Sequence, residues 1–173
     1  RYDTTHGRLA EPAELIEGML RIGKQAPMLL EQPRPELLPW GELGVDLVLE
    51  CSGHFRSHAG ASRHLQAGAE KVIIGAVPFD LADQIVVYGV NHEDVRDDSR
   101  VLSAASCTTH CIAPLLQRLD QQYGIQQVLM KEIHAYTSDQ TLLDHVHRDP
   151  RRGRAGAQNI VLSLIQISEP TRL

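Results

Sequence analysis

The feature that most constrains the fold is an apolar segment followed closely by a helical segment and a second apolar segment. The run Val45–Leu49, within GVDLVLECSG, is almost continuously apolar and ends at the small-residue turn Ser52-Gly53. Strands covered on both faces have this composition. The alanine-rich residues 57–69 predict a helix, and KVIIGAV at 71–77 predicts another buried strand. This order predicts a βαβ unit in a parallel α/β sheet.

Further short elements flank this unit. Residues 11–40 carry repeated glycines and prolines, so segments such as MLRIG and PMLLEQ predict strands and turns rather than one helix. RVLSAAS (100–106) predicts a strand, and CTTHCIAPLLQRLDQQYG (107–124) has the apolar spacing and final glycine of a helix. IQQVLMKEIHAYT (125–137) has the composition of a strand.

Composition limits the possible partners. A length of 173 residues is enough for one domain with its own core. The formal net charge of -5 argues against nucleic acid or an anionic membrane as the main partner. No apolar run approaches the ~18 residues of a membrane-spanning helix, and no signal peptide opens the chain, so we expect a cytoplasmic protein. The odd count of 3 cysteines leaves at least one thiol free, as in a reducing compartment.

The segment SAASCTTHCIAP (103–114) places two cysteines and a histidine close together. Cys107 lies where a predicted strand turns into a helix, and the positive end of a helix dipole favours a thiolate. Cys111 lies one turn further on, beside Ile112 and Leu115, and we expect it to be buried. A second segment, HAYTSDQ, adds His134, which can serve a thiolate nucleophile as acid or base.

Other roles for these side chains stay open from the residues alone. Both cysteines can be small hydrophobic core residues, and a lone histidine at the end of a strand is often structural. A zinc site would take its ligands from Cys107, His110, Cys111 and either His145 or His147. The C-x₃-C spacing on a single helix is poor for tetrahedral zinc, so we expect no metal.

These segments resemble the phosphorylating glyceraldehyde-3-phosphate dehydrogenase family. SAASCTTHCIAP is similar to the active-site motif S-N-A-S-C-T-T-N-C-L-A-P, and HAYTSDQ is similar to H-A-Y-T-x-x-Q. Further matches run in the same order, namely YDTTHGRL, LPWGELGVDLVLECSGHF, HLQAGAEKVIIGA, VYGVNHED and RRGRAGAQNIV. Together the matches span residues 2–161. Erythrose-4-phosphate dehydrogenase, a sister activity on the same scaffold, stays open, as does an inactive truncated fragment of either enzyme.

The resemblance implies a fold class and a domain division. We expect an α/β fold made of the C-terminal part of a Rossmann-type dinucleotide-binding domain in residues 1–106 and the start of an α+β catalytic domain in residues 107–161. The first βαβ unit, with its glycine fingerprint, would precede Arg1. Residues 162–173 do not resemble the family's P-x-x-T-G-A-A-K continuation, and we expect a non-native tail on a truncated chain.

The implied activity is oxidation and phosphorylation of glyceraldehyde 3-phosphate to 1,3-bisphosphoglycerate, with NAD or NADP as cofactor. Cys107 would carry the thioester, and His134 would activate the thiol and move protons. The residues expected to bind the sugar-phosphate substrate and inorganic phosphate are Ser106, Thr108, Thr137, Asp139 and Arg152. The residues expected to contact the cofactor are Ser52, Gly53, Phe55 and Gly75. The resemblance also implies a homotetramer.

A few positions depart from the family pattern. Ala104 and His110 stand where the family motif has asparagines, and Gly75 replaces a common serine. These changes leave the cysteine and the histidine in place, so we expect them to alter contacts to cofactor or substrate rather than the chemistry.

Activation of Cys107 can be tested by alkylation of the whole protein. Iodoacetamide near neutral pH should label Cys107 far faster than Cys51 or Cys111, because only Cys107 combines a helix N-terminus with a histidine partner. In a His134→Asn variant the labelling rate of Cys107 should fall, because the expected ion pair between the Cys107 thiolate and the His134 imidazolium is lost. Peptide mapping by mass spectrometry measures the three rates separately. Equal labelling of all three thiols would contradict the assignment of the nucleophile.

Overall fold

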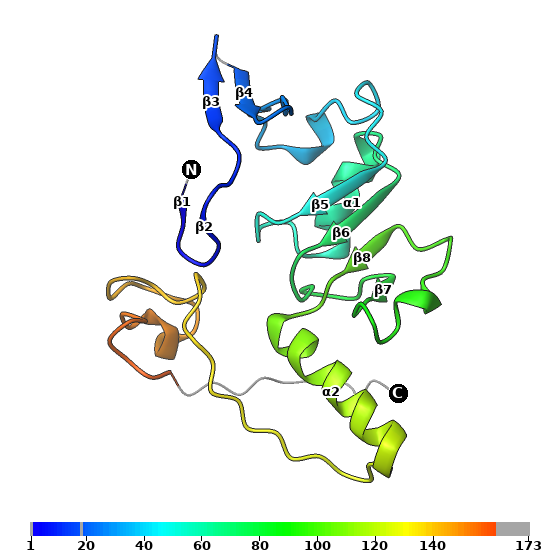
Figure 1. The fold of residues 1–173 in the computed structure, drawn as a ribbon, viewed down its shortest axis with the longest axis vertical. Coiled ribbons are helices and arrows are strands. Elements are labelled where there is room, and N and C mark those ends of the chain that lie inside the picture. The colour runs from blue at the N-terminus through cyan, green and yellow to red at the C-terminus, as the bar shows by residue number, and fades with distance from the viewer. Residues whose placement is uncertain (1, 18, 162–173) are drawn as a thin grey trace. The chain divides into compact units, whose positions relative to one another are not determined.

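A parallel sheet organises the first part of the chain. The computed structural model describes residues 2–17 and 19–161 (Figure 1), and these form two compact units that divide between residues 116 and 117. The sheet lies in the first unit and contains strands β5 (Leu47–Glu50), β6 (Lys71–Ile74), β8 (Val101–Ser103) and β7 (Gln84–Ile85), in that spatial order. Every neighbouring pair in this sheet is parallel. The predicted α/β fold is therefore confirmed.

Helix α1 (His58–Gln66) connects β5 to β6 and completes the predicted βαβ unit. The hydroxyl of Ser57 caps its first turn by accepting a hydrogen bond from the Gly60 amide at 3.0 Å. At the other end, Gly68 has a φ of +106°. Its amide and that of Ala69 donate to carbonyls of the last turn at 3.1 and 3.2 Å. Local capping therefore sets both ends of α1.

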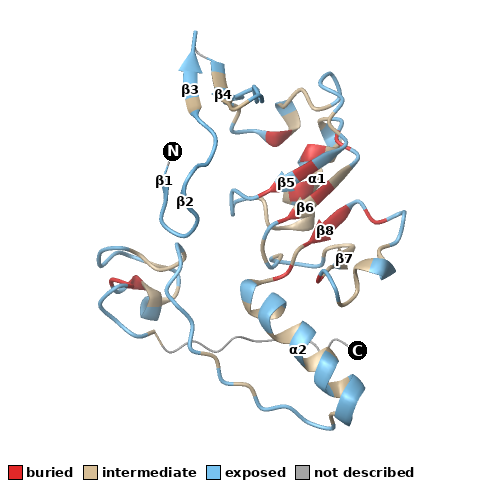
Figure 2. Cartoon of the chain, in the orientation of Figure 1, coloured by how far each residue is buried: buried red, intermediate tan, exposed pale blue. Residues whose placement is uncertain are grey.

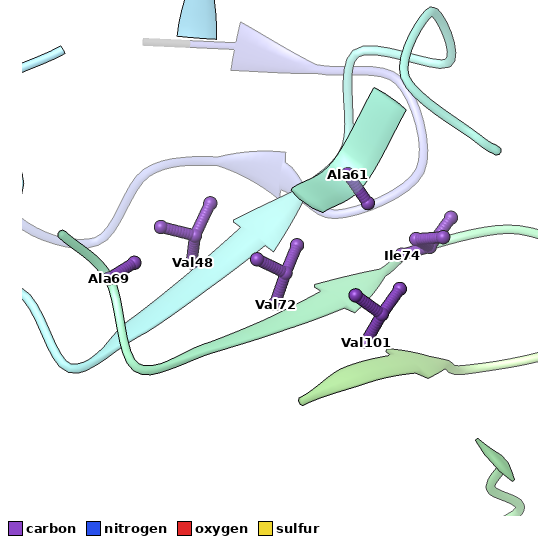
Figure 3. Close-up of a cluster of buried hydrophobic side chains, with 6 residues drawn as sticks. All are labelled: Val48, Ala61, Ala69, Val72, Ile74 and Val101. Carbon is purple, nitrogen blue, oxygen red and sulfur yellow. The ribbon is translucent and has the colours of Figure 1, made fainter. Parts of the chain in front are cut away.

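The core lies between α1 and one face of the sheet (Figure 3). Val48, Val72 and Val101 are cross-strand partners in register, and their side chains are buried. The remaining buried members of this cluster are Ala61, Ala69 and Ile74. Because α1 presents a small alanine here, the helix can approach the strands closely.

The opposite face of β5 is exposed (Figure 2). Leu47 and Leu49 retain 48% and 64% of their accessible surface, whereas Val48 and Glu50 are buried. Successive side chains on a strand point to opposite faces, and α1 covers only one of them. The prediction of a strand covered on both faces is therefore wrong for the residues that the structure describes.

Shorter elements precede and follow the sheet. Two antiparallel hairpins join β1 (Tyr2–Asp3) to β2 (Gly7–Arg8) and β3 (Ala13–Ile16) to β4 (Met19–Ile22). The 3₁₀ turns are η1 (Pro35–Leu37), η2 (His92–Asp94) and η3 (Pro150–Gly153). The predicted strand in MLRIG is confirmed as β4, whereas PMLLEQ is irregular.

Helix α2 (Cys107–Tyr123) follows β8 and confirms the helix predicted after the cysteine motif. It ends before Gly124, whose φ of +70° suits a helix C-terminus. The segment 125–137 after it contains no strand, so that prediction is wrong for this structure. A strand needs a neighbouring backbone to pair with, and within the described residues this segment has none, leaving Leu129 99% exposed. The domain boundary at 106/107 stays a prediction, and the tail 162–173 lies outside the described residues.

Two glycines provide a matched test of packing at the end of α1. A Cβ on Gly68 would lie 2.6 Å from the Gly41 backbone, whereas one on Gly44, also at positive φ, would meet nothing within 4 Å. We expect Gly44→Ala to lower the free energy of unfolding of the whole protein by about 1–2 kcal/mol, the cost of the left-handed conformation. Gly68→Ala should cost about 1–3 kcal/mol more, because the backbone must move. Equal midpoints in urea denaturation would contradict this packing.

Candidate active site

The carboxyl ends of β5 and β6 meet at one edge of the sheet. The Gly75 amide donates to the Glu50 carbonyl at 2.9 Å, and a Cβ on Gly75 would stand 3.1 Å from the Cys51 sulfur. The turn at Ser52 and Gly53 therefore lies beside Gly75. The structure thus brings together three of the residues predicted to contact a cofactor, at the edge where parallel sheets bind ligands.

The turn after β5 leaves room for a ligand. Gly53 has a φ of +77°, and nothing lies within 4 Å of the place where its Cβ would stand. Ser52 and Gly53 are both exposed. Arg56 donates from Nε and Nη2 to the Val77 carbonyl at 2.9 and 2.7 Å, which ties the loops after β5 and β6 together. The open turn on a fixed base fits the close approach of a dinucleotide.

Cys107 is the first residue of α2 and is exposed. Ser106 caps this helix, because its Oγ accepts a hydrogen bond from the Thr109 amide at 3.0 Å. The Ala104 amide donates to the Ile74 carbonyl at 2.9 Å, so the chain leaves β8 beside the end of β6. Cys107 and Thr108 therefore follow the same sheet edge that carries Gly75. The catalytic role of Cys107 stays a prediction.

The second cysteine of the motif does not behave as expected. Cys111 is exposed, and the prediction that it is buried is wrong. Helix α2 has no buried residue in the described part of the chain, so its apolar stripe supplies no core around this thiol.

Two residues that depart from the family motif, His110 and Ala104, contact each other. His110 donates from Nε2 to the Ala104 carbonyl at 2.5 Å. This bond ties the first turn of α2 to the strand exit.

Three of the residues predicted to bind anions, Thr137, Asp139 and Arg152, lie in the second unit, whereas Ser106 and Thr108 lie in the first. The Thr137 amide donates to the Gln140 side chain at 2.7 Å, and Thr137 Oγ1 accepts from the Asp139 amide at 3.4 Å. Arg152 donates to the Asp139 carboxylate and lies 3.7 Å from that of Asp149. Thr137, Asp139 and Arg152 are therefore neighbours, and Arg152 is held by carboxylates in this structure. Their role in binding anions stays a prediction.

A hollow of about 830 Å³ lies beside this turn, lined by residues 136–138 and 140–145. His134 precedes it and is exposed. Its Nδ1 donates to the Ala135 carbonyl at 2.5 Å, and its Nε2 is 4.0 Å from Glu132 Oε1. A carbonyl can only accept, so Nδ1 carries the proton in this contact. The role of His134 in proton transfer stays a prediction.

The predicted catalytic pair is divided between the units. Cys107 belongs to the first unit and His134 to the second, so their pairing stays a prediction.

Among residues 2–17 and 19–161, no group of three or more histidine, cysteine, aspartate or glutamate side chains is arranged to hold a metal ion. In the same part of the chain no helix is both long and apolar enough to cross a membrane.

Sequence reasoning missed a buried polar network behind the turn after β5. The Trp40 indole donates to His64 Nδ1 at 3.0 Å, and His64 Nε2 lies 3.0 Å from Glu50 Oε2. Glu50 Oε1 accepts hydrogen bonds from the amide of Ser52, at 2.7 Å, and from its hydroxyl. The sequence signal was the glutamate that ends an apolar strand directly before a turn.

The electrostatics of Glu50 follow from these contacts. Burial alone raises the pKa of this carboxyl, but the hydrogen bonds from Ser52 and His64 outweigh burial and lower the pKa below its ordinary value of 4.5. The hydrogen bonds therefore hold Glu50 as a buried carboxylate, although its side chain keeps only 6% of its accessible surface.

Comparison with known proteins identifies the family. The sequence profile described as "Glyceraldehyde 3-phosphate dehydrogenase, NAD binding domain" matches residues 1–58, and that of the C-terminal domain matches residues 106–167. The chain is 44% identical over 161 residues to the plasmid-encoded glyceraldehyde-3-phosphate dehydrogenase of Cupriavidus necator, covering 93% of this chain. The chain belongs to the glyceraldehyde-3-phosphate dehydrogenase family. The enzymes of that name from Mycoplasma pneumoniae and Clostridium pasteurianum are each 43% identical over the same share of this chain.

The chain spans about half the length of these relatives, 48% in each case. The predicted family is therefore confirmed, and the match to its NAD-binding domain covers residues 1–58, which include β5 of the sheet described above. The comparisons match stretches of sequence and leave the roles of individual site residues as predictions.

The lowered pKa of Glu50 predicts an acid dependence of stability. Its contribution is complete above the unfolded pKa and is lost as pH falls through the lower folded pKa. In the whole protein, the wild type should lose more free energy of unfolding than Glu50→Gln between about pH 5 and pH 3, because glutamine does not titrate. Urea denaturation at several pH values measures the difference. Parallel pH profiles would contradict a carboxylate at this position.

Proposed function

We propose that the whole protein oxidises and phosphorylates glyceraldehyde 3-phosphate to 1,3-bisphosphoglycerate, using NAD or NADP. The observation that carries the proposal is the position of the cysteine motif. Cys107 begins a capped helix at the sheet edge that also bears Ser52, Gly53 and Gly75. A thiol beside a dinucleotide edge suits the oxidation of an aldehyde held as a covalent adduct. The proposal is supported by the curated relatives, which are named glyceraldehyde-3-phosphate dehydrogenase.

In the first step the Cys107 thiolate attacks the aldehyde carbon of the substrate. A carbon–sulfur bond forms, and the carbonyl oxygen becomes the alkoxide of a thiohemiacetal. The N-terminus of α2 stabilises both the thiolate and the developing oxyanion through its dipole and amide groups. His134 protonates this oxygen and later takes the proton back from the hydroxyl.

A nicotinamide cofactor bound at the sheet edge beside Cys107 would supply the hydride acceptor. Cys107 then holds the oxidised carbon as a thioester. An oxygen of inorganic phosphate attacks the thioester carbonyl, the carbon–sulfur bond breaks, and Cys107 leaves as the thiolate. The acyl phosphate product is released, and the thiol is ready for another turnover.

The anion-binding residues serve the phosphates of this reaction. Arg152 offers a planar guanidinium that matches a phosphate, and its contact with Asp139 holds it against the Thr137 turn. Ser106 and Thr108 flank the nucleophile and would bind the second anion. An incoming phosphate competes with Asp139 for the arginine. We also propose a homotetramer for the whole protein.

A matched cysteine pair tests the proposal. In the whole protein, Cys107→Ser should reduce phosphate-dependent formation of NADH or NADPH from glyceraldehyde 3-phosphate by at least ~10³-fold, as for loss of a catalytic nucleophile. Cys111→Ser should retain most of the wild-type rate, because that thiol carries no step. Absorbance at the reduced nicotinamide band follows both reactions.

Substrate comparison completes this test. Parallel assays with erythrose 4-phosphate separate the sister activity, which would show the higher kcat/KM on the four-carbon aldehyde. Cofactor preference follows from the same assays run with NAD and with NADP. Retention of the wild-type rate by Cys107→Ser would contradict the proposed function.

A further inference from the structure

A buried charge at a sheet edge needs a reason beyond folding. Glu50 lies on the face of β5 that α1 covers, two residues after the core residue Val48. An apolar side chain at this position would be buried without the desolvation cost that a carboxylate incurs. The carboxylate therefore has a role that a valine or leucine could not fill, and its hydrogen bonds show that this role concerns the turn after β5.

The direction of each hydrogen bond in this network is determined. The indole of Trp40 can only donate, so His64 Nδ1 must accept at 3.0 Å. A neutral His64 then carries its proton on Nε2 and donates it to Glu50 Oε2 at 3.0 Å. Trp40, His64 and Glu50 come from a loop, a helix and a strand, so three separate elements fix the position of one carboxylate.

The second oxygen of this carboxylate, Oε1, holds the turn that follows β5. Glu50 Oε1 accepts from the Ser52 amide at 2.7 Å and from the Ser52 hydroxyl. The same hydroxyl oxygen accepts from the His54 amide at 3.1 Å. Because the single hydroxyl proton of Ser52 is committed to Glu50, the exposed face of that oxygen can only accept a hydrogen bond. The turn therefore presents an acceptor to solvent.

The network also reaches a second residue predicted to contact the cofactor. The rings of Phe55 and His64 meet edge to face, with their centroids 6.3 Å apart. His64 is thus linked to Ser52 through Glu50 and touches Phe55 directly. Both ends of the turn depend on the position of one buried imidazole.

We propose that Glu50, held by His64 and Trp40, is a positioning residue that fixes the 52–54 turn so that Ser52 accepts a hydrogen bond from a donor group of a bound dinucleotide. The donors available on such a ligand are its ribose hydroxyls, its carboxamide and the amino group of its adenine. The inference rests on the proposed function, because it assumes that a dinucleotide binds at this edge. Glu50 itself touches no ligand and acts through Ser52.

Glu50→Gln in the whole protein tests this role. Glutamine keeps the size of the side chain, but its amide group cannot accept from both His64 and Ser52, so the turn loses its anchor. We expect the Kd for NAD or NADP, measured by calorimetric titration, to rise by up to about tenfold, as for loss of one hydrogen bond between Ser52 and the ligand. The kcat at saturating cofactor should change by less than about threefold, because the chemical step is untouched.

Val72→Ala is the control for loss of stability alone. It removes buried methyl groups from β6 in the same sheet and leaves the turn intact. Its Kd should stay within about twofold of wild type, less than the measurable change for a lost hydrogen bond. Trp40→Phe keeps an aromatic ring but removes the indole donor, and should raise the Kd as Glu50→Gln does.

The outcomes separate the two proposals. A wild-type protein that binds neither nucleotide overturns the proposed function and this inference with it. A wild type that binds, with a folded Glu50→Gln variant of equal affinity or a Val72→Ala variant that loses as much, overturns this inference alone. Should Glu50→Gln fail to fold, ¹⁵N NMR of the wild-type His64 ring decides: a proton on Nε2 supports the network, and a proton on Nδ1 overturns it.

Discussion

Parallel pairing of β5, β6 and β8 is the constraint on which the rest of the first unit depends. The pairing aligns Val48, Val72 and Val101 across the sheet, and α1 covers that row with small side chains. Since parallel strands all end at the same edge, the turns after them emerge side by side. The predicted cofactor residues and the thiol motif share this edge because the strands preceding them run in one direction.

Charged groups lie at the ends of several helices and strands, and each has a different electrostatic environment. The start of α2 is capped by Ser106 and places its dipole at Cys107, where the proposed thiolate and oxyanion would need a positive partner. At the end of β5 the negative charge of Glu50 is buried and engaged by hydrogen-bond donors. In the second unit, Arg152 and Asp139 form an ion pair beside the Thr137 turn. The carboxylates of Glu50 and Asp139 and the guanidinium of Arg152 are thus each held by hydrogen bonds or ion pairs.

Sequence reasoning succeeded where the decisive interactions are local. The strand, helix and strand around α1 follow from apolar composition and caps within a few residues, and the helix after Cys107 follows from its apolar spacing. It failed where a partner had to be supplied from elsewhere. The segment 125–137 has strand composition but no paired backbone in the described chain, and Cys111 lies on a helix without a buried face.

The sequence by itself determined that this chain forms a βαβ unit, that Cys107 stands at a strand-to-helix turn, and which family it resembles, because these depend on patterns and neighbours along the chain. Only the tertiary structure decided that Trp40, His64 and Glu50 join, since the members are 24 and 14 residues apart and no periodicity links them. It also decided which face of β5 is covered. Such contacts arise when separate elements pack, and burial then imposes the partners that each polar group must find.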